Sequence, residues 1–199
     1  MFRRAVAPNI EIRMFETFDA ETVFAAVERN RDRLREWLPW VDGTHSAEDV
    51  REFISRVHTQ FENHQGPQCG IWVDGCFAGG FGVHPIDWGN RSCSIGYWID
   101  QSLAGRGIVS RCCEAILDHL FTDLKLHRVE IRCGTGNLRS CAIPERLGFQ
   151  REGIARQAQC VGGRWIDLMM WSMLEDEWRN RTAPATGSST GSSTGSLTS

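Results

Sequence analysis

A pair of glycines directly before a predicted helix is the part of this sequence best suited to binding a reactive ligand. The loop is Gly105-Arg106-Gly107, and the helix begins at Ile108. Glycine lets backbone amides approach a ligand closely, and the first turn of a helix adds unpaired N–H groups and a partial positive charge. Together they form a site for a phosphate group, to which Ser110 adds a hydroxyl.

The loop alone does not select a ligand, because a glycine pair before a helix is also an ordinary tight turn. Ser110 stands where a dinucleotide-binding fingerprint has its third glycine, and no Gly-Lys-Ser/Thr follows, as a Walker loop would require. A phosphate site and a simple turn therefore both remain open.

The segments around the loop predict a mixed α/β domain, since alternating and helical apolar patterns follow one another along the chain. Ser46 and Asp49 form a capping-box pattern, and Asp74-Gly75 is typical of a type I′ hairpin. The predicted order is β-α-α-β-β-β-α-β-α-β-β, with strands at Ile10–Met14, Cys69–Val73, Cys76–Val83, Ser92–Ile99, Val129–Cys133, Phe149–Cys160 and Trp165–Met173, and helices at 19–37, 46–61, 108–123 and 137–147.

Composition limits the classes of partner. The 199 residues are 41% apolar and carry a net charge of -3, which fits one globular domain and argues against nucleic acid as a partner. No apolar run is long enough to span a membrane, and the N-terminus has no apolar leader segment, so we expect a cytoplasmic protein. Eight cysteines occur without a Cys-x-x-Cys pattern, so no metal site is expected.

We place the folded domain at residues 8–180 and a disordered Gly/Ser/Thr-rich tail at 181–199.

Several short motifs carry a family resemblance over about residues 10–178. They are Ile95-Gly96-Tyr97-Trp98-Ile99, Gly105-Arg106-Gly107-Ile108, Asn137-Leu138-Arg139-Ser140, Arg146-Leu147-Gly148-Phe149 and Glu152-Gly153. In this order they resemble the GCN5-related N-acetyltransferases (GNAT). Trp37-Leu38-Pro39-Trp40 and Arg156-Gln157-Ala158 narrow the resemblance to the bacterial branch that acetylates the N-termini of ribosomal proteins.

The resemblance implies a single GNAT-like domain whose fourth and fifth strands part in a V that holds acetyl-CoA or another acyl-CoA. The amide near Ile99 would polarise the thioester carbonyl. The residues expected to hold the donor are Trp98, Ile99, Gly105, Arg106, Gly107, Ile108, Val109, Ser110 and Asn137. The family prefers other residues at Ala104 and Val109, which predicts reshaped CoA contacts rather than their loss.

Acyl transfer to an amine needs a neutral amine and a proton for the leaving thiolate. The resemblance makes Ser140 the general acid, with a helix N-cap as its alternative role. Relatives carry glutamates where this chain has Ser94 and Gln159, so the catalytic position of Gln159 lacks an ordinary base. Glu152, His84 and Asp167 are candidates that act through water; alternatively, the acceptor arrives already neutral.

We expect the acceptor to contact Trp37, Trp40, Ser94 and Gln159, although core packing explains the tryptophans equally well. The leading hypothesis is an N-acyltransferase that acetylates a primary amine, on a protein N-terminus or a small molecule, by direct attack. One alternative is an enzyme of natural-product biosynthesis or antibiotic self-resistance, with a specialised acceptor and a carrier-protein donor. Another is a non-catalytic acyl-CoA-binding domain. By analogy with relatives, a homodimer is among the expected states.

Overall fold

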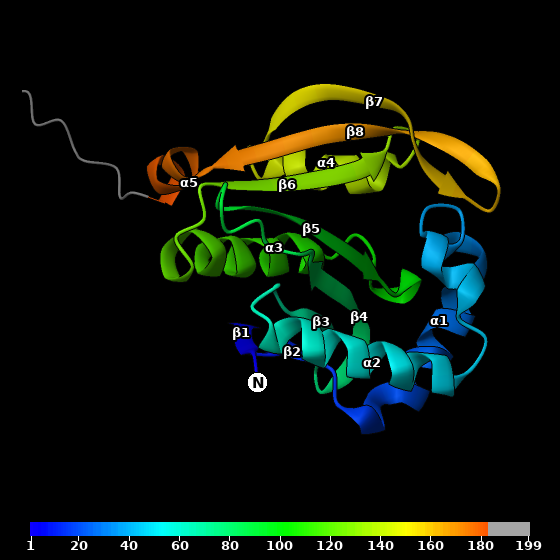
Figure 1. Ribbon diagram of the computed structural model, residues 1–199. Helices are drawn as coiled ribbons and strands as arrows, with labels where there is room; N and C mark the ends of the chain where they lie inside the picture. The colour runs from blue at the N-terminus through cyan, green and yellow to red at the C-terminus, as the bar shows by residue number, and fades with distance from the viewer. Residues whose placement is uncertain (183–199) are drawn as a thin grey trace, which may run out of the picture.

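The structure is a computed structural model that describes residues 1–182. Its centre is an eight-stranded mixed sheet in the order β1-β2-β3-β4-β5-β6-β8-β7 (Figure 1). Every neighbouring pair is antiparallel except β5 and β6, which run parallel. The strands are β1 (Arg3–Ala7), β2 (Ile10–Met14), β3 (Gln68–Val73), β4 (Cys76–Val83), β5 (Ser92–Ile99), β6 (Arg128–Gly134), β7 (Gln150–Val161) and β8 (Arg164–Leu174).

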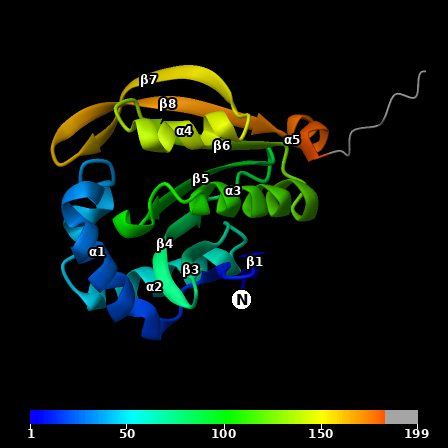
Figure 2. The ribbon, with the colours of Figure 1, turned by 180° about the vertical axis from the view of Figure 1, so that it is seen from behind.

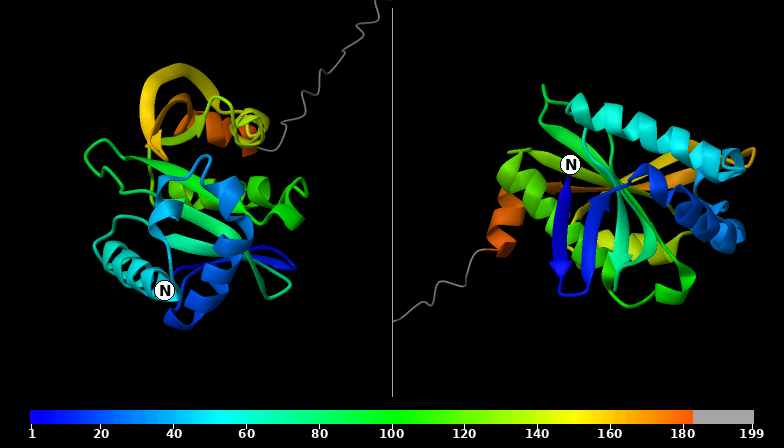
Figure 3. Two further views of the ribbon diagram at one scale, coloured as in Figure 1. Left: turned by 90° about the vertical axis from the view of Figure 1, so that its right-hand side faces the viewer. Right: turned by 90° about the horizontal axis from the view of Figure 1, so that it is seen from below.

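Helices cover both faces of the sheet, and Figure 3 shows α2 and α3 on opposite sides of it. The helices are α1 (Ala20–Leu34), α2 (Ala47–Glu62), α3 (Ile108–Asp118), α4 (Leu138–Arg146) and α5 (Glu175–Thr182). At the start of α2, Ser46 and Asp49 form the predicted capping box: the Asp49 N–H donates to Ser46 Oγ, and Asp49 accepts from the Ser46 N–H at 2.8 Å.

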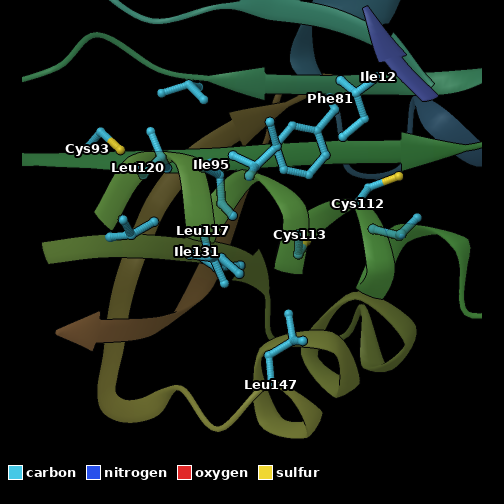
Figure 4. Close-up of a cluster of buried hydrophobic side chains, with 14 of the residues drawn as sticks. Ile12, Phe81, Cys93, Ile95, Cys112, Cys113, Leu117, Leu120, Ile131 and Leu147 are labelled. Carbon is cyan, nitrogen blue, oxygen red and sulfur yellow. The ribbon is translucent and has the colours of Figure 1, made fainter. Parts of the chain in front are cut away.

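Each face of the sheet has its own apolar core. On one face, Cys113 and Leu117 of α3 pack with Ile95 and Ile131 of the parallel strands (Figure 4). On the other face, α1 and α2 bury residues such as Val27 against β3 and β4. The parallel strands are therefore fixed from one side by α3, while their other face is open to the residues near α1 and α2.

The predicted order is right for its eleven elements but lacks β1 and α5. β1 is a half-exposed edge strand that begins with two arginines, and α5 is polar apart from the buried Trp178, so neither shows a periodic apolar stripe. β1 precedes the predicted domain start at residue 8, and α5 includes the first two residues of the predicted tail. The remainder of that tail, 183–199, lies outside the described residues.

The turn between β3 and β4 follows the sequence prediction closely, whereas the end of the first helix does not. Asp74 and Gly75 have φ angles of 50° and 75°, as a type I′ turn requires between β3 and β4. The first helix is shorter than predicted, because α1 ends at Leu34 and a 3-10 turn at Pro39–Gly43 follows. This turn carries Trp40, and Trp37 lies two residues before it; both tryptophans line the open face.

Candidate functional site

A cavity of about 1310 Å³ lies where β5 and β6 part. The two strands pair from Ser92 with Arg128 to Ile95 with Ile131 and no further. Beyond this point β5 continues to pair with β4 as far as Ile99, and β6 continues with β8 as far as Gly134. In Figure 1 the two strands lie together near α5 and separate towards α1. The predicted V-shaped opening is therefore present.

The backbone of β5 directs polar groups into this opening. Asp100 donates its N–H to Ala78 at 2.7 Å and His84 donates to the Ser94 carbonyl at 2.9 Å, so even-numbered residues of β5 face β4. By alternation, the N–H groups of Tyr97 and Ile99 face away from β4, into the cavity. The Ile99 carbonyl is already occupied, because it accepts a hydrogen bond from Arg33.

The glycine loop forms one end of the cavity, and all of the predicted donor-binding residues line it. Gly105 and Gly107 have φ angles of 80° and 71°, and Gly107 is the N-cap of α3. Within the described part of the chain, no acceptor binds the backbone amides from Gly105 to Val109. Arg106 and Arg146 lie beside these amides, and Arg146 donates to Ser110 Oγ at 3.3 Å. The loop is thus a concave set of free donors with positive charge around it.

The start of α4 forms the opposite lip of the cavity. Asn137, not Ser140, caps this helix, since its Oδ1 accepts from the Ser140 N–H at 3.2 Å; the alternative capping role for Ser140 is therefore wrong. The Ser140 carbonyl accepts from the Tyr97 hydroxyl at 3.3 Å. These bonds fix the serine backbone from two sides and leave its half-buried hydroxyl at the cavity wall.

Two thiols lie behind Ser140. The sulfur atoms of Cys133 and Cys141 are 3.2 Å apart. Burial raises the pKa of Cys133 to about 12, and a hydrogen bond with Ser140 lowers it only partly. Cys133 is consequently a neutral thiol near the Ser140 hydroxyl, which does not suit it to be a nucleophile.

Trp37, Trp40 and Gln159 form the wall towards α1. The Trp37 ring lies on β6, since a Cβ atom at Gly134 would come within 2.7 Å of two of its carbons. The Trp40 ring lies 6.4 Å from that of Trp98, and 42% of its surface stays exposed. Gln159 Nε2 donates to the Trp37 carbonyl at 3.0 Å. Both tryptophans line the cavity rather than the core.

A bulge in β7 brings Gln159 to this wall. The pairing with β8 shifts between Ala155 and Gln159, and Gln157 has a φ angle of 48°. Because the Gln159 amide donates its proton to a backbone carbonyl, a glutamate at this position could not make the same bond. Gln159 therefore joins the β7–β8 hairpin to the segment after α1, and it is not a base.

The structure does not bring two of the three candidate bases to the cavity. Glu152 pairs with Arg128 at 2.5 Å and accepts from Ser172, and these hydrogen bonds, Arg128 first, lower its pKa to about 2. Asp167 accepts from the Gln157 N–H at 2.8 Å. Neither carboxylate lines the cavity, so the expectation of a catalytic Glu152 is not supported.

His84 does line the cavity, beside Ser94. Its Nδ1 lies 2.9 Å from Ser94 Oγ, and its ring lies against Gly96, the first residue of β5 beyond the last pair with β6. Although the residue as a whole is exposed, desolvation of the ring by the cavity walls and the nearby Arg132 guanidinium lower its pKa.

Arginines on three elements make the middle of the cavity positive. Burial is the main reason why the pKa of Arg33 on α1 is lowered. Repulsion by Arg139 on α4 also lowers it, whereas the negative charge of Asp100 acts to raise it. Arg139 forms no ion pair within residues 1–182, whereas Arg132 is held by Glu130 at 2.8 Å. The spacing of Arg33 among acidic residues is typical of a solvated helix face, so its inward position is not evident from the sequence.

A buried polar contact, also absent from the predicted site, fixes α1 to the end of β5. Asn30 Nδ2 donates to Asp100 Oδ2 at 2.9 Å, and the Gln101 N–H donates to Asn30 Oδ1 at 2.9 Å. Burial acts to raise the Asp100 pKa, but hydrogen bonds from Ser102, Asn30 and Arg29 lower it to about 2. This contact therefore holds α1, which stands beside the wall of Trp37, Trp40 and Gln159 where the acceptor is expected (the acceptor wall), to the segment that leads into the glycine loop.

Residues 1–182 contain no cluster of three or more side chains suited to a metal ion. None of their helices has the length and apolar character needed to cross a membrane.

Comparisons with known proteins agree on one family. A family model described as an acetyltransferase (GNAT) domain matches residues 9–150. YdaF of Bacillus subtilis (strain 168), a protein named provisionally as a ribosomal N-acetyltransferase, is 37% identical over 89% of this chain and 98% of its own. The crystal structure of a probable acetyltransferase has a TM-score of 0.84 and 36% identity, over 89% and 99% of the two chains. RimL, a ribosomal L7/L12 alpha-N-protein acetyltransferase in complex with coenzyme A, has a TM-score of 0.83 and 25% identity, over 87% and 98%.

Proposed function

Because the chain belongs to the GNAT acetyltransferase family, we propose that it transfers an acetyl group from acetyl-CoA to the α-amine of a protein N-terminus. One observation carries this proposal: five consecutive backbone amides without acceptors, Gly105 to Val109, open into a cavity at the point where two parallel strands part. Such amides at a helix start suit the pyrophosphate of CoA, and Arg106 and Arg146 add opposite charge.

Acetyl-CoA supplies an activated acyl group as a thioester, and the protein supplies donors around it. The Ile99 N–H, which faces the opening, would stabilise the negative charge that develops on the carbonyl oxygen during attack. Asn137 uses its Oδ1 to cap α4, so its Nδ2 is available for the pantetheine arm. Trp98 and the other predicted donor-binding residues would enclose this arm.

Ser140 is the proposed proton donor to the leaving thiolate. Its hydroxyl lies at the cavity wall, and its backbone is fixed by bonds to Asn137 and Tyr97. Tyr97 does not compete for this role, because its hydroxyl is committed to the Ser140 carbonyl and burial raises its pKa well above the ordinary value. A weakly acidic hydroxyl suffices when it transfers its proton as the C–S bond breaks.

The proposed acceptor is a protein N-terminus, which the names of YdaF and RimL favour. The unpaired Arg139 and the neighbouring Arg33 favour an acceptor that carries negative charge near its amine. We therefore expect acidic residues among the first positions of a good peptide substrate. A small amine with a phosphate or carboxylate is the second candidate, because Ser94 and Gln159 leave the acceptor wall without the family's acidic groups.

Two measurements test the proposal. Calorimetry is expected to show acetyl-CoA binding at micromolar to millimolar concentration, and failure to bind at millimolar ligand would contradict the donor assignment. Thiol release is then measured with matched peptides that begin with serine or alanine, with either acidic or basic residues at the next positions. The acidic peptides are expected to react faster. Reaction only with phosphorylated or carboxylated small amines would favour the second candidate.

A further inference from the structure

We propose that His84 is the general base that takes the proton from the acceptor ammonium group, in place of a carboxylate at the acceptor wall. This inference rests on the proposed acetyl transfer. Within residues 1–182 several other titratable groups line the cavity besides His84.

The other groups in the cavity do not suit a base. Six arginines stay protonated, and Cys69, Cys133 and Tyr97 have raised pKa values. Asp49 is used by the capping box of α2. Glu52 lies at the solvent-exposed rim, 3.9 Å from Arg56. His84 is the remaining group that can accept a proton near neutral pH.

The position of His84 fits the reaction. Its ring lies against Gly96, and a Cβ atom at Gly96 would be 3.2 Å from Nε2. Gly96 is the first residue past the point where β5 and β6 separate, and Ile99, whose N–H faces the opening, is three residues further along β5. Nε2 therefore lies at the apex of the opening, against the strand that carries the proposed oxyanion donor.

The hydrogen bond with Ser94 sets the protonation of the ring. With a proton on Nδ1, the imidazole donates to Ser94 Oγ and leaves Nε2 free to accept. The same bond persists after Nε2 is protonated, so Ser94 also stabilises the imidazolium. A positioning role for Ser94 explains why a neutral residue at this site is compatible with catalysis.

The charges around the ring favour its neutral form. Arg132 of β6 is the charged group that perturbs it, and Glu130 holds that arginine. Glu52 and Arg56 of α2 pair with each other on the same cavity, and no carboxylate in the described residues lies within 4.0 Å of the ring. His84 is therefore unprotonated, and able to act, at neutral pH.

The ammonium group gives one proton to His84 Nε2, directly or through one water, and the free nitrogen lone pair attacks the thioester carbonyl. As the tetrahedral intermediate collapses, the C–S bond breaks and the thiolate takes a proton from Ser140. The nitrogen loses its second proton, which restores the Ser140 hydroxyl. His84 then releases its proton to solvent, so the products are the amide, CoA thiol and one proton.

The test compares two small acceptors of different basicity at pH 7. Glycinamide has a largely protonated α-amine that must be deprotonated, whereas the terminal nitrogen of acetohydrazide is already neutral. His84→Gln is expected to lower the rate with glycinamide about tenfold, because only the neutral fraction of the amine, about a tenth at pH 7, can then react, and to change the rate with acetohydrazide little. With glycinamide, the acidic limb of kcat/KM lies below the ordinary histidine pKa in the wild type and should move up to the pKa of the amine in the variant.

Two controls separate catalysis from structure. His127→Gln changes an exposed histidine outside the cavity and should leave both rates unchanged, and acetyl-CoA affinity should be equal in all three proteins. Equal losses with both acceptors, or an acidic limb in His84→Gln that stays at its wild-type position, would overturn the assignment while the proposed function stands. Failure of the wild type to acetylate either acceptor would contradict both.

Discussion

At the scale of single residues, Ser140 is held by its backbone, and its hydroxyl lies at the cavity wall. Asn137 caps α4 and Tyr97 binds the Ser140 carbonyl, and neither contact involves the serine side chain, whose own hydrogen bond is with the Cys133 thiol. A substitution that removes only the hydroxyl should leave the helix in place. The chemical and structural roles of this residue can therefore be separated by experiment.

Ser140→Ala is expected to lower kcat by on the order of 10²-fold, because the thiolate would leave without its proton donor. Acetyl-CoA affinity and the unfolding temperature should change little. Steady-state kinetics and calorimetry measure these quantities, with Ser55→Ala, at an exposed site on α2, as the matched control. An unchanged kcat would show that the thiolate leaves unprotonated or takes its proton from another group.

Contacts between residues far apart in the chain are what the sequence does not predict, even where it predicts the residue itself, as for Gln159. Gln159 bonds to the carbonyl of Trp37, 122 positions away, and a local pattern carries no information about that pairing. Arg33 has the spacing of a solvated residue, yet it turns inward to the end of β5. By contrast, the predicted donor-binding residues all line the cavity, because each belongs to a short motif at the end of one element.

At the scale of elements, the glycine loop connects β5 to α3 and depends on left-handed backbone at two positions. A Cβ atom at Gly107 would meet no atom within 4 Å, so only the backbone angle restricts this position. An alanine in this conformation costs about 1–2 kcal/mol, which the loop can relieve by rotating its amides. The orientation of the phosphate donors thus depends on Gly107.

Gly107→Ala is expected to weaken acetyl-CoA binding about tenfold, since the rotated amides no longer converge. Gly75→Ala is the matched control, because Gly75 has nearly the same φ angle, 75°, equally open surroundings and a place in the β3–β4 turn. Both variants should lose similar stability in thermal unfolding, while calorimetry finds weaker binding only for Gly107→Ala. Equal affinity in the two variants would contradict the role of the loop.

The elements themselves follow the sequence well where apolar periodicity is strong. Ile10–Met14 and Ser92–Ile99 have the predicted bounds, since alternation reflects one buried face. The edge strand β1 and the polar helix α5 bury few side chains, so neither has the apolar periodicity from which the other elements are predicted. α1 ends at Leu34, before the irregular segment that carries Trp37 and leads to the 3-10 turn with Trp40.

At the scale of the whole molecule, two half-sheets meet along a short parallel pairing. Figure 2 shows β6, β7 and β8 with α4 on one side and β3 and β4 with α1 and α2 on the other. β5 pairs with β6 over four residue pairs, and on the side of β3 and β4 the contact of Asn30 with Asp100 fixes α1 to the end of β5. Asp100 is the one ionised side chain of that buried contact, so its charge couples pH to the stability of the fold.

Asp100→Asn is expected to lower the free energy of unfolding at pH 7 by about 2 kcal/mol. The folded pKa of Asp100, about 2, lies below its unfolded value, so its contribution is complete above about pH 4 and is lost as pH falls towards 2. The gap between wild type and variant in urea unfolding should therefore close over this range. Asp32→Asn, at an exposed site on α1, should produce no such gap; a gap independent of pH would contradict the argument.

The parting of β5 and β6 gives the sheet an edge in its interior. An open edge of a sheet is a template for any extended polyamide, which is why outer strands are prone to aggregation. Here the N–H groups of Tyr97 and Ile99 face inward, between the glycine loop and the two tryptophans after α1. The same exposed groups thus become a recognition surface: a slender amide chain, such as pantetheine or the first residues of a peptide, can complete the sheet where a neighbouring protein cannot.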